Sequence, residues 1–253
     1  MILAIDIGNT NIALGGFSED KLCFVARVST DASKTSDEYA SILLNTLSLY
    51  KVCPEAIEGA IVSSVVPALN RAIRDAVRFI CGTEPLLVGP GVKTGIGLHC
   101  DDPASVGADL VCACVAARSL YGSPALIIDM GTATKMTVID EKGAFIGVSI
   151  IPGVNMGLKA LSEGTAQLPQ VSLVEPKSVI GKNTAECMRS GIIYGNASLL
   201  DGMIDRFNSE MNTELPVIAT GGLSKTIISH CKHEITVDEN LVLKGLNIIY
   251  GKN

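Results

Sequence analysis

Two segments, one in each half of the chain, share the same pattern, and this internal repeat restricts the fold more than any other feature. Residues 3–10 read LAIDIGNT and residues 126–134 read LIIDMGTAT. Each segment is a short apolar run that ends in Ile-Asp, followed by one residue, a glycine, and small hydroxyl or amide residues. Such a run is typical of a buried strand, and the glycine allows a tight turn at its end. We therefore expect a duplicated domain.

The elements predicted after each segment also occur in the same order. In the first half we expect strands at 11–17, 22–28, 60–66 and 85–88, and helices after Thr35-x-x-Glu38, from Pro67, and near 105–120. In the second half we expect strands at 135–139, 144–151, 216–220 and 234–237, and helices from Asn183-x-x-Glu186 to near 208, after Gly222, and at 240–250. Both halves read β-β-β-α-β-α-β-α, which predicts an α/β fold.

The natural break between the halves is Tyr121-Gly122-Ser123-Pro124, since no longer linker rich in Pro, Gly or Ser occurs. We predict one domain at 1–121 and a second at 122–253. Duplicated α/β domains that face each other form a cleft between them, which is the usual place for a ligand.

The composition agrees with this architecture and excludes others. The 253 residues are 47% hydrophobic but only 4% aromatic, with no Trp, so the core must come from Ile, Val, Leu and Ala. Buried parallel strands with covering helices have this composition, and the apolar share excludes disorder. The net charge of −6 argues against nucleic acid or an anionic membrane surface as the main partner.

The N-terminus and the cysteines indicate a soluble, cytoplasmic protein. The first residues, MILAIDIGNT, lack a basic segment, and Asp6 interrupts the apolar run, which is unlike a signal peptide. The longest charge-free stretches, such as 143–158, contain Gly and Pro and are too short to span a bilayer. Eight cysteines are scattered without a C-x-x-C pair, so we expect buried free thiols rather than disulfides or metal ligands.

Both repeated turns have the chemistry of a phosphate-binding loop. Glycine lets backbone N–H groups approach an anion, and the residues around it add neutral donors. Those donors are Asn9, Thr10, Thr132 and Thr134. Asp6 and Asp129 would repel phosphate, so they suit a site in which a cation lies between them and a nucleotide. We assign Asp6 to Mg²⁺, through water. Neither turn is a Walker A motif, and no G-x-G-x-x-G fingerprint occurs.

Further glycines fit the same interpretation, although each alone could be an ordinary turn residue. Gly221-Gly222 lies between a predicted strand and helix, where a flat backbone could contact an adenine or ribose. Gly147 and Pro152-Gly153 flank an apolar stretch that could line a pocket.

Five motifs, in a fixed order, cover the chain: Asp6-Ile-Gly-Asn-Thr10, Gly107-Ala-Asp109, Asp129-Met-Gly-Thr-Ala-Thr134, Ile151-Pro-Gly153 and Thr220-Gly-Gly222. This set resembles type III pantothenate kinases, in the superfamily of acetate and sugar kinases, heat-shock chaperones and actin. The resemblance implies two ribonuclease-H-like (actin-like ATPase) domains and a homodimer. It also implies ATP-dependent phosphorylation of pantothenate, the first step of coenzyme A synthesis, with Mg²⁺ and with K⁺ or ammonium.

The resemblance also assigns roles to individual residues. The implied ATP contacts are Asp6, Gly8, Asn9, Thr10, Asn11, Thr132, Gly221 and Gly222. The implied pantothenate contacts are Gly107, Ala108, Asp109, Leu110 and Thr184. Asp6 would hold Mg²⁺, and Asp129 would ligate K⁺, which offers a neutralising charge where no Lys is available. Asp109 would accept the proton of the pantothenate hydroxyl.

The bottom-up chemistry of Asp109 supports that role. Phosphoryl transfer needs positioning and charge neutralisation, and a carboxylate beside the attacking hydroxyl orients it and accepts its proton late. Asp109 also stands just inside a predicted helix N-terminus, where an acidic residue is electrostatically favoured, so it could be only a capping residue.

One position departs from the family. The family pattern at the substrate loop is Gly-x-Asp-Arg, whereas this chain has Leu110 after Asp109. Leucine cannot pair with the pantothenate carboxylate, and losing a charge-assisted hydrogen bond costs about 1.5–3 kcal/mol. Another basic residue could replace it, from the same chain or across the dimer, the candidates being Arg118, Arg189 and Lys159. Otherwise the enzyme is weak, or the chain is a nucleotide-binding regulatory protein or a kinase of another small alcohol on the same fold.

Overall fold

The structure is a computed structural model that describes all residues, 1–253. Its internal contacts divide the chain into two compact units. The first unit comprises Met1–Tyr121 together with Leu241–Asn253, and the second comprises Gly122–Asn240.

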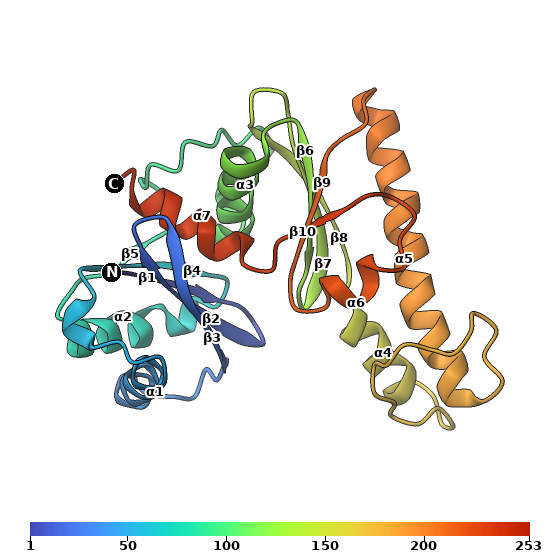
Figure 1. Cartoon of the computed structure of the whole chain (residues 1–253), viewed down its shortest axis with the longest axis horizontal. Coiled ribbons are helices and arrows are strands. Elements are labelled where there is room, and N and C mark those ends of the chain that lie inside the picture. The colour runs from blue at the N-terminus through green and yellow to red at the C-terminus, as the bar shows by residue number, and fades with distance from the viewer. The chain divides into compact units, whose positions relative to one another are not determined.

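Each unit is built around a five-stranded mixed sheet with the same strand order (Figure 1). The first sheet has the order β3-β2-β1-β4-β5. Its strands are β1 (Ile2–Ile7), β2 (Asn11–Ser18), β3 (Lys21–Ser29), β4 (Gly59–Ser64) and β5 (Leu86–Leu87). The second sheet has the order β8-β7-β6-β9-β10. Its strands are β6 (Ala125–Met130), β7 (Ala133–Ile139), β8 (Phe145–Pro152), β9 (Val217–Thr220) and β10 (Thr236–Val237).

The pairing directions repeat as well. In each unit the first three strands are antiparallel neighbours, and the first, fourth and fifth strands are parallel. The predicted duplication and the α/β, ribonuclease-H-like fold class are therefore confirmed.

Helices cover both faces of the first sheet. Alternate side chains of β1 point to opposite faces, as the strand period of two requires. Leu3, Ile5 and Ile7 pack with α1 (Ser36–Leu49) and α2 (Pro67–Cys81). Ala4 lies on the other face, in a cluster with α3 (Ala108–Tyr121) and α7 (Leu241–Tyr250). Two short 3₁₀ turns complete the unit, at Pro54–Ala56 and Pro103–Ser105.

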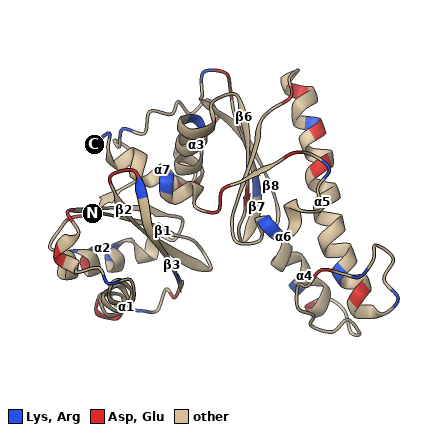
Figure 2. Cartoon of the chain, viewed as in Figure 1, with Lys and Arg blue, Asp and Glu red and all other residues tan.

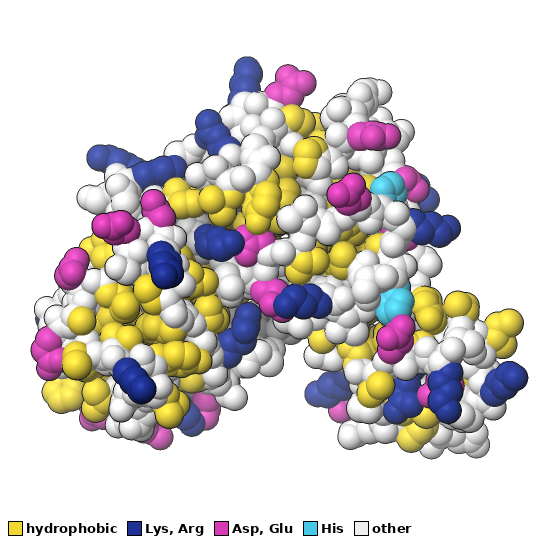
Figure 3. Space-filling model, viewed as in Figure 1, with side chains coloured by type: hydrophobic (Ala, Val, Ile, Leu, Met, Phe, Trp, Pro, Cys, Tyr) yellow, Lys and Arg dark blue, Asp and Glu magenta, His cyan; other side chains and the backbone are white.

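The second unit contains α4 (Val154–Glu163), α5 (Thr184–Met211) and α6 (Ser224–Ile228). Apolar residues of β6, including Leu126, Ile128 and Met130, share a core with the buried face of α5. No helix of the chain is long and apolar enough to cross a bilayer. All eight cysteines are free. Acidic and basic residues are interspersed along both units (Figure 2), and their side chains are mixed on the face shown in Figure 3.

The predicted helix caps are present. The Thr35 side chain accepts a hydrogen bond from Glu38 N, and Glu38 in turn accepts one from Thr35 N, a complete capping box. Asn183 caps α5 by accepting from Glu186 N at 3.0 Å. The Glu186 carboxylate is used elsewhere, since it accepts from Lys177 N and pairs with Arg189.

Three details differ from the sequence-based expectations. The second domain was expected at 122–253, but its compact unit ends at Asn240, because α7 packs on α3, β1 and β4 of the first unit. A helix, α4, follows Pro152-Gly153 where no helix was predicted. The helix expected near 105–120 begins at Ala108, because Pro103–Ser105 forms a separate 3₁₀ turn.

Candidate functional site

The first glycine turn is a tight, fixed loop between β1 and β2. Gly8 N donates a hydrogen bond to Asn11 O at 3.0 Å, and a methyl group at Gly8 would lie 3.0 Å from that same oxygen. Thr30 holds the loop from β3's end, since its Oγ1 donates to Gly8 O at 2.6 Å and its N donates to Thr10 O at 3.0 Å. The side chains of Asn9 and Thr10 are exposed. Thr30 had no signal in the sequence, because its contacts arise only through the sheet.

The predicted substrate loop lies next to the ends of β1 and β4, in the same unit. Val65, the residue after β4, donates its N–H to Ile7 O at 3.0 Å. A methyl group at Gly107 would lie 3.7 Å from Val65 Cγ1, so residue 107 is close to the end of both strands. Asp109 follows in the first turn of α3, half-buried, with its Oδ1 accepting from Leu110 N at 2.8 Å.

A buried thiol shows that Asp6 and Asp109 share one neighbourhood. Cys112 is completely buried on α3, one turn after Asp109. Burial raises the pKa of the Cys112 thiol well above its ordinary value, and the negative charges of Asp6 and Asp109 raise it further. Both carboxylates, one predicted for the metal and one predicted as the base, therefore lie close enough to Cys112 for their charges to act on its thiol.

In the second unit, three glycine motifs meet at the other predicted loop. A methyl group at Gly153 would overlap Thr132 O and lie 2.8 Å from Gly131 O. Gly221 has φ of 97° and is packed so closely that a methyl group would lie 2.5 Å from Met130 O. Only glycine fits at both positions. The Gly131-Thr132 turn, the Pro152-Gly153 motif and the Gly221 turn therefore form one region, with Thr132 and Gly222 exposed.

Asp129 is paired with a lysine. Asp129 on β6 and Lys135 on β7 are directly opposite in the antiparallel register. Their Oδ2 and Nζ atoms are 2.7 Å apart, with side chains 16% and 18% exposed. The expectation that no Lys is available near Asp129 is therefore wrong. Sequence reasoning missed this residue because the pair forms across two strands.

Leu110 and Thr184 are placed differently. Leu110 is 8% exposed, so this position is an apolar part of the unit rather than an open polar site. Thr184 is the exposed first residue of α5 in the second unit.

The basic residues considered as replacements for the missing Arg have other partners. Arg189 pairs with Glu186 at 2.9 Å, and Lys159 is 3.7 Å from Glu163. Arg118 lies in the last turn of α3, nine residues after Asp109, which corresponds to about 13 Å along the helix. Within the same chain, Arg118 is therefore at the opposite end of α3 from the predicted base.

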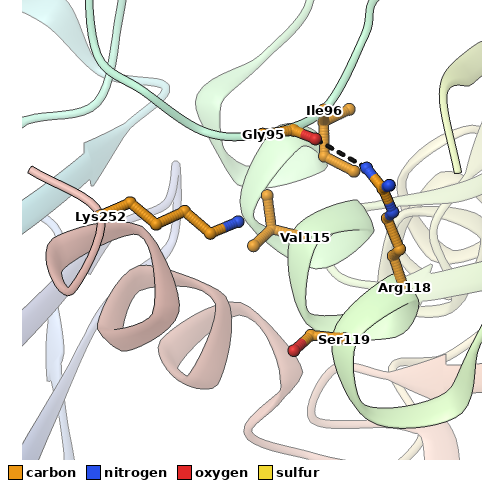
Figure 4. Close-up of a pocket in the computed structure, with 6 residues that line it drawn as sticks. All are labelled: Gly95, Ile96, Val115, Arg118, Ser119 and Lys252. Atoms are coloured by element: carbon orange, nitrogen blue, oxygen red, sulfur yellow. Dashed lines mark hydrogen bonds between the residues drawn. The ribbon is translucent and has the colours of Figure 1, made fainter.

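Arg118 lines a cavity of about 300 Å³ at that end of α3 (Figure 4). The other lining residues are Gly95, Ile96, Val115, Ser119 and Lys252. Arg118 Nη1 donates to Gly95 O at 2.7 Å, and Lys252 Nζ donates to Thr94 O at 2.9 Å. Both cations thus fix the 94–95 loop to the helices, and we assign this cavity no catalytic part.

Comparison with solved structures agrees with this fold. The chain aligns over 100% of its length with a solved structure of a putative 2-dehydro-3-deoxygalactonokinase from Sinorhizobium meliloti, with a TM-score of 0.62, 13% identity and 96% of that chain covered. The fold is thus that of two ribonuclease-H-like domains.

Sequence relatives identify the family within this fold. Residues 2–206 match the type III pantothenate kinase family. The chain is 41% identical to the type III pantothenate kinase of Bifidobacterium animalis subsp. lactis and 42% identical to that of Moorella thermoacetica, with 100% of each chain covered. The protein belongs to the type III pantothenate kinase family.

Proposed function

We propose that this protein transfers the γ-phosphoryl group of ATP to the primary hydroxyl of pantothenate, the first step of coenzyme A synthesis. Full-length membership of the type III pantothenate kinase family supports the reaction. The observation that carries the mechanism is geometric: Asp6 lies opposite Ser63 in the β1–β4 register, and Gly107, two residues before Asp109, packs against Val65 just after β4.

In the first unit, Asp109 accepts the proton of the attacking hydroxyl. Its position after Gly107, beside the ends of β1 and β4, suits a carboxylate that orients a substrate. The loop from Gly8 to Asn11 offers backbone N–H groups and neutral side chains to the ATP phosphates. Gly107 to Leu110 contact pantothenate.

Asp6 fits a hydrated Mg²⁺. No cluster of three or more His, Cys, Asp or Glu forms a protein-made metal cage. Mg²⁺ usually keeps several waters and is held by one or two carboxylates plus substrate phosphates. Asp6, half-buried at the end of a strand, can provide one such carboxylate. When bound, the ion neutralises phosphate charge. Asp6 orients it through water.

In the second unit, Thr132, Gly221 and Gly222 contact ATP. Their support is the close packing of the three glycine motifs, which leaves backbone and small side chains at the surface. A homodimer is a further proposal that rests on the family resemblance. A cytoplasmic location is also a proposal, and the free cysteines suit it.

Leu110 had suggested an alternative, a regulatory nucleotide-binding protein or a kinase of another alcohol. The full-length relatives named type III pantothenate kinase do not favour it. A buried leucine at this position is compatible with a substrate loop that recognises pantothenate without the family Arg.

The direct test is to incubate the purified protein with ATP, Mg²⁺ and pantothenate and to detect phosphopantothenate by mass spectrometry. Asp109→Asn should lower turnover at least about 100-fold, because the proton acceptor is lost. The Asn oxygen can still accept from Leu110 N, so folding and ATP affinity should change little. Asp101→Asn, an exposed change in the preceding loop, is the control. Normal turnover by the Asp109 variant would remove this residue as the base.

A further inference from the structure

The region around Asp129 does not fit the monovalent cation that the family resemblance implies. The Lys135 ammonium is already 2.7 Å from Asp129 Oδ2. Both side chains are more than four-fifths buried, so a second cation at the same carboxylate would meet a like charge with little water to screen it.

The pair is fixed by the sheet rather than by flexible surface side chains. Asp129 and Lys135 are direct cross-strand neighbours, within a register that runs unbroken from Ala125↔Ile139 to Met130↔Thr134. Side chains of directly opposite residues lie on the same face of a sheet and interact. A register slip would turn one of them to the apolar face, where Ile128 and Met136 are buried in the core. The ammonium therefore stays at Asp129.

The pair also lies at the base of the predicted nucleotide loop. Asp129 and Lys135 flank the turn at Gly131-Thr132, which packs against Gly153. A charge held at this point stabilises the loop and the anionic phosphates expected above it in the same way as a bound cation would.

We propose that Lys135 replaces the monovalent cation, so that its tethered ammonium supplies the positive charge at Asp129 and the enzyme works without K⁺ or ammonium ions. This inference rests on the proposed kinase activity. Lys135 acts as a positioning and charge-neutralising residue, and it takes no part in bond making.

The test compares turnover in buffers that contain KCl or choline chloride. Wild-type protein should show equal rates in both. Lys135→Met removes the charge while keeping a long side chain. The rate of this variant should fall at least about tenfold in choline chloride and should recover when K⁺ is added. Lys135→Arg keeps the charge and should stay independent of K⁺. Lys142→Met, in the exposed turn after β7, is the matched control and should behave as wild type. A wild-type rate that requires K⁺ would overturn the inference.

A second readout separates this inference from the proposed activity. The thermal midpoint is measured with a non-hydrolysable ATP analogue and Mg²⁺, in KCl and in choline chloride. K⁺ should stabilise Lys135→Met specifically and leave the wild type unchanged. If neither protein phosphorylates pantothenate, the proposed function fails, but the thermal comparison still decides the role of Lys135. The proposed role of Lys135 would be contradicted if K⁺ specifically stabilised the wild type, or if K⁺ stabilised neither protein.

Discussion

At the scale of single residues, the first unit combines a polar site with an apolar interior. Asp6 and Asp109 lie near Cys112, which is completely buried on the same helix as the predicted base. A buried thiol with a raised pKa remains protonated and unreactive at neutral pH. Cys112 is therefore a small hydrophobic residue beneath the site and not a nucleophile.

Thiol labelling should reveal this difference between cysteines. Burial raises the pKa of Cys114 to about 12 and that of Cys112 well above its ordinary value, so both thiols stay protonated far above neutral pH. Iodoacetamide near pH 8 should modify exposed Cys53 and Cys187 in the folded protein but spare Cys112 and Cys114. Mass spectrometry of the digest measures the result, with denatured protein as the control. Equal labelling of Cys112 and Cys53 in folded protein would contradict the burial.

Restoring the family residue at position 110 should harm this protein. Leu110 is 8% exposed, and a guanidinium placed there must lose most of its water. We expect Leu110→Arg to lower the thermal midpoint and the pantothenate turnover. Leu120→Arg, at a 49% exposed position of the same helix, should leave both nearly unchanged. A strong rise in turnover would instead mean that no other residue of this protein replaces the missing Arg.

At the scale of elements, a close contact between two helices fixes the position of α3. A methyl group at Gly245 of α7 would overlap the backbone carbonyl oxygen of Cys112. Backbone on both sides leaves no flexible side chain that could move aside. The glycine therefore sets how closely α7 supports the helix that carries Asp109.

Substitution of helix glycines tests this contact. Gly245→Ala should destabilise the protein by about 2–4 kcal/mol, since overlap in a packed core forces backbone shifts. Gly202→Ala is the matched control, because Gly202 lies inside α5 with open space around it. It should be neutral or stabilise by up to about 1 kcal/mol, from the better helix propensity of Ala. Denaturant unfolding measures both variants. Equal changes in unfolding free energy for the two variants would contradict a tight contact between α7 and α3.

At the scale of the whole molecule, the chain returns to its first unit after completing the second. Leu243, Leu246 and Ile249 of α7 are buried in the cluster that contains Ala4 and Ile61. The last residue is also bound to the first unit, since the Asn253 side chain accepts a hydrogen bond from Lys93 N and donates one to Lys93 O.

Truncation should show that the first unit depends on this segment. Removal of residues 241–253 exposes the face of the sheet that α7 covers. Each buried aliphatic side chain contributes about 1.5–3 kcal/mol, so losing three approaches the stability of a typical domain. We expect loss of cooperative unfolding and of activity. Removal of 251–253 alone keeps α7 and should cost far less. Retained activity and stability in the long truncation would contradict the division into units.

The sequence alone was sufficient for the features that depend on local patterns. Apolar periodicity and capping signals predicted most helices and strands, including the capping box at Thr35, and the repeated Ile-Asp-x-Gly segments predicted the duplicated fold. Helix α4 was not predicted, because the proline and glycine before it also suit a loop.

The tertiary structure alone decided which distant residues meet. The return of α7 to the first unit, the support of Gly8 by Thr30 and the pairing of Asp129 with Lys135 all arise between elements. Local patterns describe which face of an element is apolar, but they carry no signal for which polar side chains the packing and register bring together. Asp6 and Asp129 were thus visible in the sequence as a repeated motif, while the Lys135 charge that neutralises Asp129 was not.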